Sequence, residues 1–135
     1  APVAERVVST LVYARYGYEY FQQTPEGRIA LGGFSDLDGA DSYTDAEEGN
    51  PKVWERLERY LRDELGQTAA QITHRWVGIV GFSEGDRPLV RQMDDGVYAL
   101  GGYSGTGNLI GFIAGRAVAE HIASGRSADF ALLAF

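Results

Sequence analysis

Val97-Tyr-Ala-Leu-Gly-Gly-Tyr-Ser-Gly-Thr-Gly-Asn108 combines a short apolar strand pattern with a run of glycines, and a helical pattern over residues 109–123 follows it. Backbone N–H groups at the start of a helix carry partial positive charge, and glycines let a ligand approach the main chain closely. The stretch therefore predicts a strand–loop–helix unit that binds an anionic or polar ligand.

The glycine run does not match the common nucleotide-binding fingerprints. The G-x-G-x-x-G spacing of dinucleotide-binding folds fails because Ile110 stands where a third small residue is needed after Gly105 and Gly107. Only ten residues follow Gly125, too few for a further strand carrying a ribose-binding acid, and no Gly-Lys-Ser/Thr occurs. We therefore expect the loop to close a binding site that begins elsewhere.

The preceding residues predict a β-hairpin, a helix and further strands. Residues 13–23 and 28–34 flank a Thr24-Pro-Glu-Gly27 turn. In the first of these strands, Tyr16, Tyr18 and Tyr20 alternate and are expected to share one face. A helix is predicted from Asn50-Pro51 to Gly66, and a strand over residues 72–82. The fold class is therefore α+β with a mainly antiparallel sheet.

Composition excludes several classes of site and partner. The 135 residues include no cysteine, so a disulfide framework and a cysteine-ligated metal are impossible, and His74 and His121 are too far apart to form a helical metal pair. The aspartates of the 35–49 loop lack calcium-loop spacing, so we expect no metal. With a net charge of -7 and Lys52 as the only lysine, we expect no nucleic-acid or membrane partner and a cytoplasmic location.

Three segments of the chain form a recognisable series. The first is the hairpin, residues 18–33. The second is Trp76-Val-Gly-Ile79 followed by Glu84-Gly-Asp-Arg-Pro88. The third is the glycine-rich stretch 97–108 with the small-residue helix after it. In this order they resemble the C-terminal part of FAD-dependent oxidoreductases of the D-amino-acid oxidase (DAO) superfamily, nearest the glycine, sarcosine and γ-glutamylputrescine oxidase branch.

The resemblance implies a fragment of a two-domain FAD-linked oxidoreductase fold. Residues 1–90 correspond to the C-terminal portion of a substrate-binding domain, and residues 91–135 to the closing strand–loop–helix of an FAD-binding domain. The implied function is oxidation of an amine or amino acid C–N bond by hydride transfer to flavin. Tyr18 and Tyr20 are expected to line the substrate, and no catalytic residue is identified. The expected cofactor contacts are Gly101, Gly102, Tyr103, Ser104, Gly105, Thr106, Gly107 and Asn108.

Departures from the family pattern qualify this function. Ile79-Val80-Gly81 stands where several amino-acid oxidases place a carboxylate-binding arginine, which favours an amine substrate. Thr106 replaces a histidine common among relatives, and a cysteinyl flavin link is impossible within the chain. Because the N-terminal βαβ half is missing, we expect this chain alone to be inactive and not to retain FAD. The alternative is a non-enzymatic α+β module that binds a ligand or forms a homodimer through exposed sheet edges.

Overall fold

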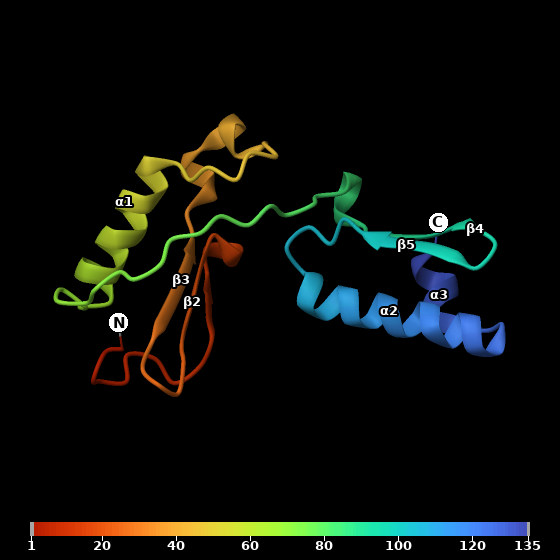
Figure 1. Ribbon diagram of the computed structural model, residues 1–135, viewed down its shortest axis with the longest axis horizontal. Helices are drawn as coiled ribbons and strands as arrows, with labels where there is room; N and C mark the ends of the chain where they lie inside the picture. The colour runs from red at the N-terminus through yellow and green to blue at the C-terminus, as the bar shows by residue number, and fades with distance from the viewer. Residues whose placement is uncertain (1, 135) are drawn as a thin grey trace. The chain divides into compact units, whose positions relative to one another are not determined.

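Two antiparallel sheets and three α-helices make up the described part of the chain, residues 2–134 of a computed structural model (Figure 1). The predicted α+β class is confirmed. The strands and helices, in chain order, are β1 (Val12–Ala14), β2 (Glu19–Gln23), β3 (Ile29–Gly33), α1 (Pro51–Arg59), β4 (Leu89–Asp94), β5 (Val97–Gly101), α2 (Gly107–Ser124) and α3 (Ala128–Leu133).

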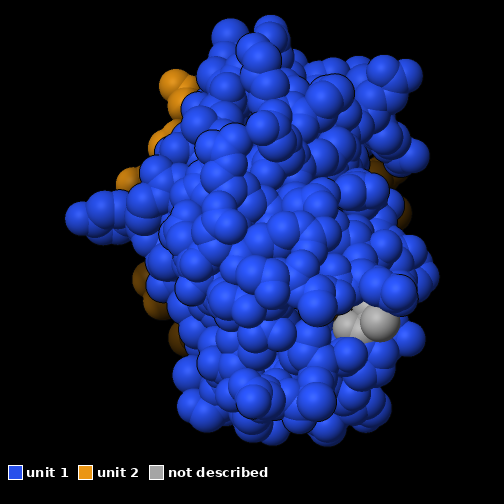
Figure 2. All heavy atoms as spheres, turned by 90° about the vertical axis from the view of Figure 1, so that its left-hand side faces the viewer, with its two compact units in different colours: residues 1–79 blue, residues 80–135 orange. Residues whose placement is uncertain are grey.

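The chain divides into two compact units, coloured separately in Figure 2. Unit 1 comprises residues 1–79 and carries β1 to β3 with α1; unit 2 comprises residues 80–135 and carries β4, β5, α2 and α3. Among residues 2–134, none of the helices combines the length and apolar character that a bilayer crossing requires.

The hairpin of unit 1 forms where it was predicted, but its first strand is interrupted. Gly27 closes the β2–β3 turn with φ +85°, as the turn chemistry requires. Residues 15–17 form a short 3₁₀ turn between β1 and β2, in which Tyr16 and Gly17 have φ of 58° and 93°. The prediction that Tyr16, Tyr18 and Tyr20 share a strand face is therefore wrong, because only Tyr20 lies within a strand.

A salt-bridged arginine holds this turn in place. The Arg15 guanidinium donates to the carboxylate of Glu19, a residue that is only 4% exposed. It also pairs with Asp36, with 3.1 Å between Arg15 Nη1 and Asp36 Oδ2. Both carboxylates raise the pKa of Arg15 above its ordinary value, Glu19 contributing most. A guanidinium that bridges two acids ties the turn to the segment after β3, and no strand-pattern argument reveals such a long-range contact.

The core of unit 1 lies between the sheet and α1. Asn50 caps the helix by accepting the Lys52 N–H at 2.9 Å, which confirms the predicted start. After α1 the chain makes one π-helical turn over residues 60–64. The Tyr60 ring packs on Phe21 and Phe34, with centroids 5.9 and 5.5 Å apart. Burying these rings supplies the main apolar contact of a small unit.

The predicted strand over residues 72–82 does not form. The segment is extended and largely exposed, and no ladder joins it to β1, β2 or β3 within the described residues. Arg75 instead attaches the segment to α1 by pairing with Glu58 at 3.2 Å. Just before the segment, Arg62 donates to the carbonyl of Thr68 at 2.7 Å. An extended segment forms a β-strand only when a neighbouring strand supplies backbone hydrogen bonds, and residues 2–134 supply no such neighbour here.

Glu58 should make unit 1 sensitive to acid. Hydrogen bonds from Arg62 above all, then the charge of Arg75, hold the pKa of Glu58 below its ordinary value of 4.5. A lowered folded-state pKa gives stability that is present above pH 4.5 and is lost as pH falls through the folded pKa. We expect Glu58→Gln to flatten this part of the pH dependence of the melting temperature. Glu55→Gln, at an exposed helix pair with Arg59, is the matched control and should leave the acid limb steep.

Unit 2 packs α2 and α3 against the β4–β5 hairpin. Gly96 lies in the β4–β5 turn with φ +70°. Val90, Ala114 and Val118 form the core of the unit, and none of the three is more than 6% exposed. The sequence does not predict α3, which begins where the Ser127 side chain accepts the Phe130 N–H at 3.2 Å. The end of α2 at Gly125, with φ +68°, is as expected.

Candidate functional site

The glycine-rich loop between β5 and α2 takes backbone conformations that glycine favours. Gly102 has φ +60° and Gly105 has φ +86°, while Ser104 is also left-handed at φ 47°. A Cβ at Gly105 would meet nothing within 4 Å. The loop therefore leaves open space beside its main chain, as a backbone that receives a ligand must.

Ser83 anchors the loop to the turn before β4. Its hydroxyl lies 2.8 Å from the carbonyl oxygen of Gly102 and within hydrogen-bonding distance of the Arg87 carbonyl. The Ser83 N–H donates to the Ser104 hydroxyl at 3.3 Å, and the Ser104 N–H donates to the Gly81 carbonyl at 3.0 Å. Sequence reasoning missed Ser83, because a serine before Glu-Gly-Asp signals only a turn.

The start of α2 presents unpaired donors. Thr106 does not cap the helix: its hydroxyl donates back to the Tyr103 carbonyl at 2.7 Å. Among the described residues, no backbone hydrogen bond starts from the N–H of Gly105, Gly107 or Asn108. The loop also lacks Asp, Glu, Lys and Arg, so the backbone dipoles determine its local charge.

The Tyr103 ring packs on α2, the helix that follows the loop. A Cβ built at Gly107 would lie 3.5 Å from the Tyr103 ring, and one at Gly111 would lie 3.4 Å from it. The small-residue face of α2 therefore receives this ring at Gly107 and Gly111, whereas Gly115 has open space around it. These residues fit the flavin cofactor that the resemblance implies, since open main chain and unpaired N–H groups suit its polar edge and phosphates.

The two predicted substrate tyrosines lie in unit 1. Tyr20 is 46% exposed and its ring stacks on Tyr13, with centroids 5.8 Å apart and planes inclined by 22°. The Tyr20 ring also covers Gly32, where a Cβ would lie 2.5 Å from it. Tyr18 precedes β2, and its ring centroid lies 5.9 Å from the Arg15 guanidinium carbon. The structure thus adds Tyr13 to the aromatic face. The sequence did not reveal this contact because it depends on the β1–β2 register, which pairs Tyr13 with Tyr20.

Comparisons with known proteins agree on one family. Residues 3–121 match the sequence profile of DAO, FAD dependent oxidoreductase. The chain is 31% identical over 122 residues to the "Probable oxidoreductase OrdL" of Rhizobium meliloti (strain 1021). The aligned part covers 89% of this chain and 26% of that relative, so the chain spans about a quarter of the length of the curated relative it matches. No solved structure matches the chain.

Proposed function

This chain belongs to the DAO family of FAD-dependent oxidoreductases, and from that premise we propose that it is part of an enzyme that oxidises the C–N bond of an amine or amino acid. Bound FAD supplies the hydride acceptor for this chemistry. The observation that supports a cofactor role for unit 2 is the group of unpaired N–H donors at Gly105, Gly107 and Asn108, beside open main chain.

In this proposal, loop 101–108 binds and orients the cofactor. Gly101 and Gly105 allow close approach to the main chain, whereas Ser83 occupies the space beside Gly102. The N–H groups at the start of α2 favour negative charge on whatever they contact. The bonds from Ser83 hold the loop in one conformation, which reduces the entropy lost when a ligand binds. Residues 91–135 are accordingly assigned to an FAD-binding domain, and residues 1–90 to a substrate-binding domain.

We assign substrate binding to the exposed face of Tyr20 and to Tyr18. Tyrosine ring faces attract cations such as ammonium groups. The stretch Ile79-Val80-Gly81 offers no guanidinium to clamp a carboxylate, which favours an amine over a free α-amino acid. A cytoplasmic location is part of the same proposal, and the absence of cysteine is compatible with it.

The test is anaerobic flavin reduction by the full-length protein that carries this chain. Mixing with a panel of secondary and primary amines should bleach the visible flavin absorption, whereas the corresponding α-amino acids should react more slowly. Reduction by α-amino acids alone would refute the amine preference. A full-length protein that contains no flavin would contradict the proposal as a whole and would favour the non-enzymatic module.

A further inference from the structure

The edge strand β3 and the extended segment over residues 70–76 lie on either side of a gap. The chain leaves β3, passes through α1 and returns in this extended segment, which is the order of a β–α–β crossover. The sheet order is β1-β2-β3, so β3 is an edge strand. Among residues 2–134, no backbone hydrogen bond joins β3 to residues 70–76.

The ladder alternation shows which groups of β3 face the gap. Thr24 N–H bonds to the Arg28 carbonyl at 2.8 Å, and Phe34 N–H bonds to the Tyr18 carbonyl at 2.6 Å, so hydrogen-bonded pairs stand at both ends of the β2–β3 ladder. In an antiparallel ladder such pairs alternate with unbonded ones. The N–H and C=O groups of Ile29 and Leu31 therefore point away from β2, toward the free edge.

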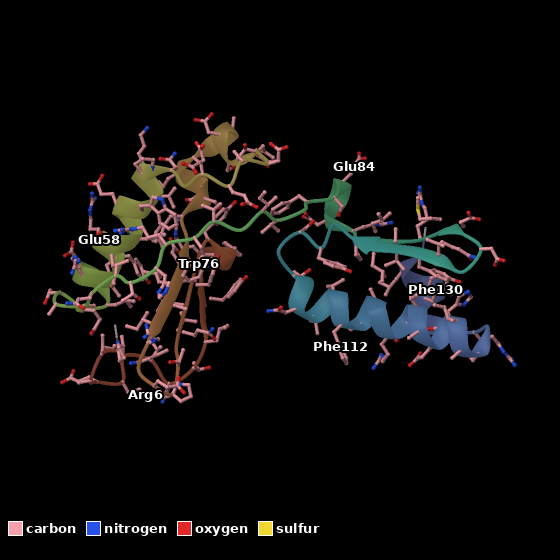
Figure 3. The ribbon with its side chains drawn as sticks, in the orientation of Figure 1. Arg6, Glu58, Trp76, Glu84, Phe112 and Phe130 are labelled. Carbon is pink, nitrogen blue, oxygen red and sulfur yellow. The ribbon has the colours of Figure 1, made fainter. Side chains whose placement is uncertain are left out.

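A cavity of about 280 Å³ occupies the gap. Its apolar lining comes from β3 through Ile29 and Leu31, from α1 and the turn after it through Trp54, Leu57 and Leu61, and from the extended segment through Ile72 and Trp76. Figure 3 labels Glu58 on α1 and Trp76 on the segment, two of the residues around the cavity. Trp76 remains 66% exposed, so the gap is not closed by the side chains beside it.

Side-chain contacts hold the segment on the helix side of the gap. Arg62 donates to the Thr68 carbonyl at 2.7 Å and to the Ala70 carbonyl at 3.5 Å, and the Glu58 carboxylate pairs with both Arg62 and Arg75. The segment therefore stays beside α1 while its main chain lacks a ladder. Among the described residues, no backbone hydrogen bond joins β3 to residues 72–76 across the apolar gap, so these two stretches form the outer members of a split β–α–β unit.

We propose that one further β-strand, supplied by the part of the polypeptide outside these 135 residues, inserts between β3 and residues 72–76. The chain spans 26% of the length of the OrdL relative, so a family fold has ample further sequence to supply a strand. The inserted strand places apolar side chains over Trp54, Leu57 and Leu61 and bonds to the free groups of Ile29 and Leu31. A second copy of this chain is a poorer occupant, because each copy carries a net charge of -7.

Amide hydrogen exchange tests the proposal. In chain 1–135, held at a concentration where sedimentation shows a monomer, the Ile29 and Leu31 amides should exchange rapidly, whereas the Ala30 and Gly32 amides, bonded to β2, serve as protected references. In the full-length protein, the Ile29 and Leu31 amides should slow by about 100-fold or more. Unchanged exchange there would overturn the proposal, as would a gene product that consists of these 135 residues alone.

A proline substitution provides the second measurement. Leu31→Pro removes an outward N–H while sparing the bonds of Ala30 and Gly32, and Leu31→Ala is the matched control that shortens the side chain but keeps the N–H. In the full-length protein, Leu31→Pro should lower the melting temperature more than Leu31→Ala does. In chain 1–135, the two variants should lower it by similar amounts.

A Leu31 amide already protected in the monomeric chain would show direct closure onto residues 72–76. Protection that rises with concentration would identify a second copy. Either result would overturn the proposal.

Discussion

Replacing Gly33 with alanine is expected to unfold unit 1 at ordinary temperature. A Cβ at this position would lie 2.0 Å from the Tyr18 carbonyl oxygen and 2.8 Å from the Glu19 Cα, and both are backbone atoms that cannot turn aside. The φ of +122° is in addition one that a side chain rarely adopts. The Tyr18 carbonyl also accepts the Phe34 N–H, so any movement that relieves the clash breaks the end of the ladder. We expect a loss above about 3 kcal/mol, comparable with the whole stability of so small a unit.

The matched control is Gly39→Ala. Gly39 also has a positive φ, +54°, but a Cβ there would meet nothing within 4 Å. It should cost only the backbone term, about 1–2 kcal/mol. Thermal unfolding, followed by circular dichroism in the aromatic region, measures both variants. If the loss of unfolding free energy in Gly33→Ala were within about 1 kcal/mol of the loss in Gly39→Ala, the close approach of β3 to the Tyr18 carbonyl would be incorrect.

The second large effect concerns cofactor binding at Gly105. In the full-length protein we expect Gly105→Ala to weaken FAD retention by about 10- to 100-fold, or about 1.4 to 2.7 kcal/mol. The added methyl group would enter the space beside the main chain that is open around Gly105, next to the unpaired N–H groups of Gly107 and Asn108. Dialysis followed by flavin absorbance and fluorescence measures the retained fraction.

Gly85→Ala separates cofactor contact from backbone strain. Gly85 lies in the same unit, has φ +65° and, like Gly105, has no atom within 4 Å of a built Cβ. Both variants should therefore destabilise chain 1–135 by similar amounts, whereas only Gly105→Ala should release FAD from the full-length protein. Equal flavin loss from the two variants would remove the loop from the proposed cofactor site.

Local signals account for the elements that could be predicted. The β2–β3 turn at Gly27, the Asn50 cap of α1, and the succession from β5 through the glycine loop to α2 each depend on residues a few positions apart. Turn conformation, helix capping and glycine's freedom at positive φ act over that range. Chain order and residue type were also enough to indicate the family, which the comparisons then showed.

Contacts between distant residues account for the rest. Arg15 reaches Asp36 and interrupts a strand that the tyrosine alternation predicted, and Ser83 fixes the loop at Gly102 from nineteen positions away. The sequence by itself determined the fold class, the turns and the glycine-rich loop, because backbone preferences encode them. Only the tertiary structure decided that residues 72–82 join no strand ladder among the described residues and that Tyr13 pairs with Tyr20, because pairing requires a neighbour and the sequence of one strand does not specify which neighbour is present.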